Sequence, residues 1–112
     1  MQRITVALVF SAAALLLAAP TLARATSTVD VKAKHFAFTL STKTVHHGSI
    51  AFAIENVGKT AHDFAIAGRR SAVIGPGKST RLVVTLRRGH YPYKCTIDAH
   101  AKLGMKGVLV VT

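Results

Sequence analysis

The sequence predicts an all-β domain, a single β-sandwich of about seven mostly antiparallel strands. After residue 25, apolar and polar residues alternate in short runs, and no stretch sustains the 3.6-residue period of an amphipathic helix. Turns that contain glycine or proline separate these runs, as in sandwiches built from many short strands. The length of 112 residues allows one domain and excludes most multi-domain enzymes.

Residues 1–25 are expected to be an export signal and not part of the fold. A positive charge near the N-terminus precedes an apolar run over residues 4–19, Pro20 ends that run, and residues 23–25 form a small-x-small cleavage pattern. The run is shorter than the ~20 residues of a membrane span. We therefore expect an exported, periplasmic or otherwise extracytoplasmic domain of residues 26–112 without a transmembrane span. A retained anchor, and with it membrane association, is the alternative.

The expected strands follow one another along this domain, and each is justified by its alternation of apolar and polar residues. They cover residues 28–34, 36–40, 50–56, 62–67, 81–86, 89–95 and 108–111. Turns are expected at residues 46–49, 56–59 and 75–77. The apolar side chains expected to share one face of their strand are Val29, Val31, Phe36, Phe38, Leu40, Ile50, Phe52, Ile54, Phe64, Ile66, Leu82, Val84, Leu86, Tyr91, Tyr93 and Cys95.

Charge and cysteine content narrow the functional classes. The chain has 15 Lys and Arg against 4 Asp and Glu, a net charge of +11. Nucleic-acid binding is not expected, because the chain is predicted to be exported and lacks a motif of interleaved basic and aromatic residues.

A domain this small gains stability from a metal, a disulfide or oligomerisation. The single cysteine, Cys95, cannot form an intramolecular disulfide; taken alone, it is a buried thiol, an intermolecular disulfide or a metal ligand.

Four residues form a pattern with a specific chemistry. Cys95, His100 and Met105 stand in a C-x4-H-x4-M motif between two expected strands, and His62 begins an earlier one. A thiolate and two imidazoles with a weak axial thioether are the ligands of blue-copper electron-transfer sites. Each residue alone has an ordinary explanation, such as a strand-end histidine, a buried thiol or a core methionine. Zinc could bind Cys and two His, but the methionine would then have no role.

The segment 89–111 resembles the C-terminal copper loop of the cupredoxins, the plastocyanin and azurin family. Residues 50–64 resemble that family's strand, Asn-x-Gly turn and first histidine ligand, and the similarity covers most of residues 29–112. The resemblance implies a Greek-key sandwich that holds one type 1 copper ion per chain. It assigns the equatorial ligands and the axial ligand as follows: His62, Cys95 and His100 equatorial, and Met105 axial.

Three places depart from the usual cupredoxin pattern, and in the first of them Thr60 and Ala61 lack the proline commonly found before the first histidine. Asp98 and Ala99 stand where Pro-Gly often precedes the second histidine, which places a carboxylate near the expected metal. Asp63 follows the first histidine where the family commonly has Asn. The resemblance implies that the backbone N–H of this residue bonds the cysteine sulfur, and that its side chain braces the copper loop. We therefore expect Asp63 to reach Thr96.

The other histidines are not expected to be ligands. At about 3.3 Å per residue of strand, His46 and His47 should lie on the order of 20 Å from the expected metal site. His90 should lie roughly 16 Å from it. A second, surface metal site at His46 and His47 is an alternative. The pattern gives no placement for His35.

The resemblance and the donor set predict a protein that carries one electron at a time. His100 is expected to be the port through which the electron enters and leaves. Lys59, Lys102 and Lys106 flank the ligand segments, and we expect them to steer an acidic redox partner. The chain is expected to be a monomer and not an enzyme, because an oxidase needs further copper centres. The alternative function is copper binding or delivery without electron shuttling, and attraction to an anionic lipid surface also stays open.

Overall fold

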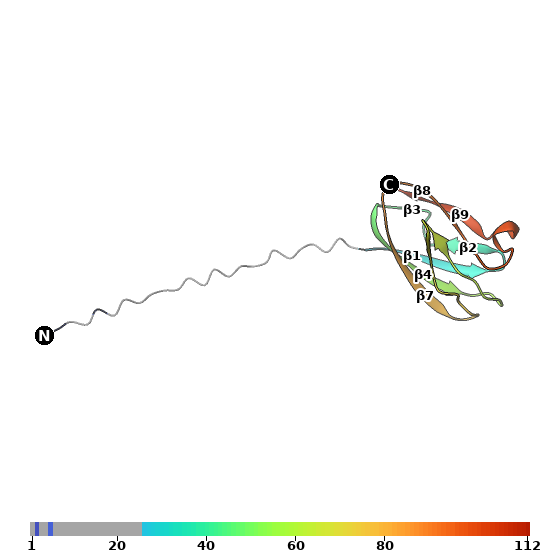
Figure 1. Ribbon diagram of the computed structural model, residues 1–112, viewed down its shortest axis with the longest axis horizontal. Helices are drawn as coiled ribbons and strands as arrows, with labels where there is room; N and C mark the ends of the chain where they lie inside the picture. The colour runs from blue at the N-terminus through green and yellow to red at the C-terminus, as the bar shows by residue number, and fades with distance from the viewer. Residues whose placement is uncertain (1, 3–4, 6–25) are drawn as a thin grey trace.

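The structure is a computed structural model that describes residues 2, 5 and 26–112. The expected export segment lies outside the described residues apart from Gln2 and Thr5. The described chain forms nine strands in two sheets and one short 3-10 helix, so the predicted all-β sandwich is confirmed (Figure 1). Among these residues, no helix has the length and apolar character that a membrane span requires.

The first sheet has four strands in the order β2-β1-β4-β7. Strand β1 (Ser27–Lys34) lies in the middle and pairs antiparallel with β2 (Ala37–Leu40) and parallel with β4 (Gly48–Asn56). Strand β7 (Ser79–Leu86) pairs antiparallel with β4 along eight register partners and closes the sheet. The sheet is mixed, since it contains one parallel pair beside two antiparallel pairs. The parallel pair is possible because β1 and β4 are joined by the long connection through β2 and β3 and not by a hairpin.

The second sheet has five strands in the order β3-β9-β8-β5-β6. Its centre is the antiparallel pair of β8 (Gly89–Lys94) and β9 (Lys106–Val111). The short strands β5 (Ala65–Ile66) and β6 (Arg69–Arg70) continue it on one side, and β3 (Thr44–Val45) pairs parallel with β9 on the other. The helix η1 (Ala101–Leu103) lies in the connection between β8 and β9, at the end of the sandwich away from the C-terminus (Figure 1).

Three details of the expected strands are corrected. Strands β3 and β6 were not predicted, since two residues are too few to show an alternating pattern. The strand expected over residues 62–67 reduces to β5, and His62 instead forms an isolated bridge with Ile74. Phe36 was expected to continue a strand, but it lies in the turn between β1 and β2 and is 37% exposed.

The core lies between the sheets, where one cluster joins residues of both. Phe64 is at its centre, and its ring packs against Phe38, Phe52 and Tyr93 at centroid distances of 5.3, 5.1 and 5.4 Å. The alternation of the sequence predicted most of the inward side chains, because a strand's period of two follows from local backbone geometry. Of the sixteen expected on one face, Phe38, Leu40 and Tyr91 are half-buried and Phe36 is exposed. The other twelve are buried: Val29, Val31, Ile50, Phe52, Ile54, Phe64, Ile66, Leu82, Val84, Leu86, Tyr93 and Cys95.

Candidate metal centre

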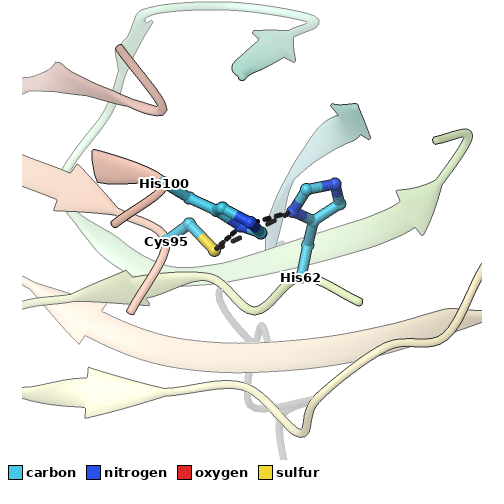
Figure 2. A group of neighbouring side chains, drawn as sticks. All are labelled: His62, Cys95 and His100. Atoms are coloured by element: carbon cyan, nitrogen blue, oxygen red, sulfur yellow. Dashed lines mark hydrogen bonds between the residues drawn. The ribbon is translucent and has the colours of Figure 1, made fainter. Parts of the chain in front are cut away.

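Three predicted donor side chains meet at one end of the sandwich. Nδ1 of His62 lies 3.2 Å from Nδ1 of His100, and Sγ of Cys95 lies 3.9 and 3.6 Å from these two atoms. Figure 2 shows the three atoms turned toward one another from separate segments of the chain. The point equidistant from them lies about 2.1 Å from each, close to the ~2.0–2.1 Å of a zinc–imidazole bond and the ~2.3 Å of a zinc–thiolate bond. The three side chains can therefore share one metal ion without moving.

The segment that carries His62 is held by a buried asparagine. Strand β4 ends at Asn56, whose Nδ2 donates to the carbonyl oxygens of Thr60 and Ile74 at 2.7 and 2.8 Å. Its Oδ1 accepts from the backbone N–H of Gly58 at 2.9 Å, which closes the turn. His62 and Ile74 then exchange two backbone hydrogen bonds. Asn56 was expected to end a strand and begin a turn; the structure shows that its side chain also positions the first histidine.

Cys95 and His100 stand in the connection between β8 and β9. The backbone N–H of Cys95 donates to the carbonyl oxygen of Met105, and that of Met105 donates to the carbonyl oxygen of His100, each at 3.1 Å. The chain can return at Gly104 because its φ is 111°, in the left-handed region that glycine adopts without strain. These bonds make the connection a closed loop that presents Cys95 and His100 to the same point.

Asp63 joins the two donor segments. The backbone N–H of Thr96 donates to Oδ1 of Asp63 at 2.6 Å, and the Thr96 hydroxyl donates to Oδ2. The carboxylate is 1% exposed, so these two donors replace the water that it loses on burial. The contact expected between Asp63 and Thr96 is present.

Met105 is fully buried and packs in a small cluster with Cys95 and Ala33, next to the larger core. Phe38 and Ile97 cover this cluster. The thioether is thus enclosed beside the cysteine and shielded from solvent. This placement suits a weak, soft donor that would compete poorly with solvent.

Burial shifts the acid–base chemistry of two donors. Loss of solvation raises the pKa of the Cys95 thiol, while hydrogen bonds from the backbone N–H groups of Asp63 and Ile97 act in the opposite direction. Those hydrogen bonds favour the thiolate, the form that binds metals. The pKa of His62 is lowered, first by burial and then by the nearby His100 and His35, which favours the neutral imidazole. Its Nε2 is buried without a hydrogen-bond partner, which leaves Nδ1 as the atom that faces the other donors.

The surface next to the site contains two aromatic residues that the sequence analysis did not assign to it. His35, exposed in the turn after β1, packs edge-on against His62 and His100 at centroid distances of 5.6 and 5.8 Å. One ring nitrogen of His35 also bonds the Thr60 hydroxyl at 3.0 Å. Phe36 packs against His100 at 5.5 Å. No periodic pattern could have found them, because they reach the site through the pairing of β1 with β4.

The remaining histidines lie outside the donor group. Within the described residues, the cluster of candidate metal ligands contains His62, Cys95 and His100 alone. The side chain of His47 bonds the carbonyl oxygen of Thr112.

The charged residues near the donor group do not all lie on one surface of the protein. Lys59 and Lys102 are exposed, in the loop after β4 and in η1. Lys106 lies opposite Lys94 on the pair of β8 and β9 and points away from the core. Asp98 is exposed, has a left-handed φ of 46°, and is not in the donor group.

Comparison with known proteins shows which family and which solved structures this chain is similar to. A family model described as a cupredoxin-like domain matches residues 7–111. A search of curated proteins finds no match. Among solved structures, the dithionite-reduced auracyanin of Roseiflexus castenholzii is 21% identical, with a TM-score of 0.66 over 78% of this chain and 98% of that chain. Auracyanin A of Chloroflexus aurantiacus, a "blue" copper protein, is 20% identical, with a TM-score of 0.64 over 76% and 98%.

The chain is also similar in structure to part of an enzyme. The blue copper oxidase of Nitrosomonas europaea is 17% identical, with a TM-score of 0.63 over 77% of this chain and 38% of that chain. At these identities the likeness establishes a shared fold. The donor set itself, a thiolate and two imidazoles with a thioether beside them, fits a single type 1 copper ion.

Removal of the Asp63 carboxylate should loosen both donor segments. Asp63→Ala leaves two Thr96 donors without an acceptor, and we expect the free energy of unfolding of the metal-free protein to fall by about 2–4 kcal/mol in urea denaturation. Asp63→Asn keeps an acceptor oxygen and should lose about half as much. The control Asp30→Ala removes an exposed carboxylate and should change stability by less than about 0.5 kcal/mol. Equal losses in Asp63→Ala and Asp30→Ala would contradict this role.

Proposed function

This chain belongs to the cupredoxin family, and on that premise we propose that it is an exported blue copper protein that carries single electrons. The observation that carries the proposal is the convergence of Nδ1 of His62, Nδ1 of His100 and Sγ of Cys95 on one point. A thiolate with two imidazoles serves Cu(I) and Cu(II) alike, since neither oxidation state is fully satisfied by such a mixed set. Little rearrangement of the protein is then needed when the charge of the site changes.

Each donor has a distinct task in this proposal. His62, Cys95 and His100 would hold the ion, and Met105 would supply a weak thioether donor that tunes the reduction potential. Bound copper supplies the one-electron Cu(I)/Cu(II) couple. The hydrogen bonds described above for Asn56 and Asp63 keep the three equatorial donors in place in both oxidation states.

His100 is the proposed electron port. It is the donor nearest to solvent, with 8% of its surface exposed, whereas His62 and Cys95 are at 0% and 1%. Phe36 packs against it, and Leu103, 57% exposed, follows in η1. These apolar groups favour close approach of a partner, while the exposed Lys59 and Lys102 favour an acidic one.

Electron transfer is favoured over catalysis by the number of donor groups. An oxidase that reduces oxygen needs several copper centres, and the described residues contain one cluster of three candidate ligands. A carrier needs one enclosed site with a short path to the surface. The four donors and the partly exposed His100 supply both.

Export is proposed from the sequence of residues 1–25, with its apolar run and its small-x-small pattern at residues 23–25. N-terminal sequencing of the protein recovered from the extracytoplasmic fraction should begin at Thr26. A chain that keeps residues 1–25 and sediments with membranes would instead identify the segment as an anchor.

Copper loading tests the function directly. The protein with one equivalent of Cu(II) should show an intense visible thiolate-to-copper band, and Cys95→Ser should abolish it. The control Ser71→Ala leaves all donors in place and should keep the band.

A second experiment separates an electron carrier from a copper-delivery protein. Voltammetry of the carrier should give a reversible wave. A competing Cu(I) chelator should remove copper from it far more slowly than the site exchanges electrons. An irreversible wave with rapid loss of copper to the chelator would identify a copper-delivery protein.

Met105 should set the reduction potential and leave the colour of the site intact. Met105→Gln replaces a soft thioether by a harder amide oxygen, which favours Cu(II), so the potential should fall while the visible band persists. Leu103→Gln introduces the same amide on the exposed helix η1 and should leave the potential unchanged. If both variants shift the potential equally, Met105 is not the axial ligand.

A further inference from the structure

A groove of about 960 Å³ lies over β5, β6, β8 and β9 on the face turned away from the core. We call it the cationic groove, because its lining includes Arg69, Arg70, Lys94 and Lys106 and no acidic residue. None of these four side chains belongs to the proposed copper site. Lys94 and Lys106 nevertheless stand next to Cys95 and Met105 in the chain, so the groove begins one residue away from two of the proposed donors.

The pairing of the strands arranges most of these charges in one row. Arg70 is the register partner of Ala65, Ala65 of Lys94, and Lys94 of Lys106, across four neighbouring strands. Partners directly opposite share a face, with Cβ atoms about 4.5–5.5 Å apart. Like charges in such a pair destabilise a sheet. The pair of Lys94 and Lys106 therefore costs the isolated protein stability, which an anionic occupant of the groove would offset.

No acid of the described chain neutralises this row. Asp63 is buried and bonded to Thr96. Asp30 and Glu55 lie on β1 and β4 of the other sheet, and Asp98 is exposed in the loop after β8, outside the lining of the groove. The positive potential of the groove is consequently open to a partner.

A second row in the groove is apolar. Pro92 and Val108 are register partners, and each lies two residues along its strand from Lys94 or Lys106. Two residues of a strand span about 7 Å. Val108 is 48% exposed, and Ala67, in the turn after β5, also lines the groove. The groove thus offers a cationic edge and an apolar edge that run side by side.

We propose that the cationic groove binds an extended segment of a partner protein in which acidic and apolar side chains alternate. Successive side chains of an extended chain point to opposite sides, so the acids of such a segment face Lys94 and Lys106 while its apolar side chains face Pro92 and Val108. Single-stranded nucleic acid is a poorer match, because it needs exposed aromatic rings. Tyr93 is the aromatic residue of the lining, and it is 3% exposed.

A pair of peptides of equal composition tests the pattern. The full chain, loaded with Cu(I), is titrated with acetyl-Asp-Leu-Asp-Leu-Asp-Leu-amide and with acetyl-Asp-Asp-Asp-Leu-Leu-Leu-amide, and amide shifts are followed by NMR. The alternating peptide should bind more tightly and shift the resonances of Ala65, Lys94 and Val108. The same titration without copper should give the same result, since the groove does not depend on the metal. Failure of the copper site and failure of this proposal are therefore distinguishable.

Matched charge variants complete the test. Lys94→Gln with Lys106→Gln should weaken binding of the alternating peptide by about tenfold. Arg81→Gln with Arg87→Gln removes two exposed charges, one near the start of β7 and one in the turn after it, and should leave binding unchanged. Equal affinity for the two peptides, equal loss in the two double variants, or no binding at all would each overturn the proposal. Phosphatidylglycerol vesicles that bind through Lys94 and Lys106 more strongly than the alternating peptide would overturn it in favour of a lipid surface.

Discussion

The buried bridge between Asp63 and Thr96 is the constraint on which the rest of the site depends. Asp63 follows His62, and Thr96 follows Cys95, so two hydrogen bonds hold together two donors that are 33 residues apart in the chain. A carboxylate at 1% exposure is stable only while both of its oxygens accept hydrogen bonds. The bridge therefore has one favourable geometry, and in that geometry the sulfur and the imidazole nitrogen face the same point.

The sandwich separates two chemical environments by a single layer of strands. Cys95 directly follows β8 and Met105 directly precedes β9, and both are buried with apolar neighbours. On the outer side lie Lys94 and Lys106, each one residue away along the chain. The alternation of a strand produces this arrangement, because successive side chains point to opposite faces. A low-dielectric metal site and a strongly positive surface can thus coexist in adjacent residues.

The fold was largely predictable because its strands are long enough to show a local pattern. Twelve of the sixteen residues expected on one strand face are buried, as a period of two predicts. The errors lie where that pattern is too short or is overridden. Strands β3 and β6 have two residues each, and Phe36 continues the alternation of its neighbours but lies in a turn beside His100. The segment after His62 is held by hydrogen bonds from Asn56 rather than by a ladder.

By itself, the sequence determined the inward face of each long strand and the order and chemical types of the candidate donors. These are local properties, readable from the spacing of His62, Cys95, His100 and Met105. Only the tertiary structure decided that His35 packs against two of the donors, that Asn56 supports the first, and that the cations of the groove form a row. Such contacts depend on which strands pair and in which register. That choice is made by the packing of residues distant in the chain, and no local pattern records it.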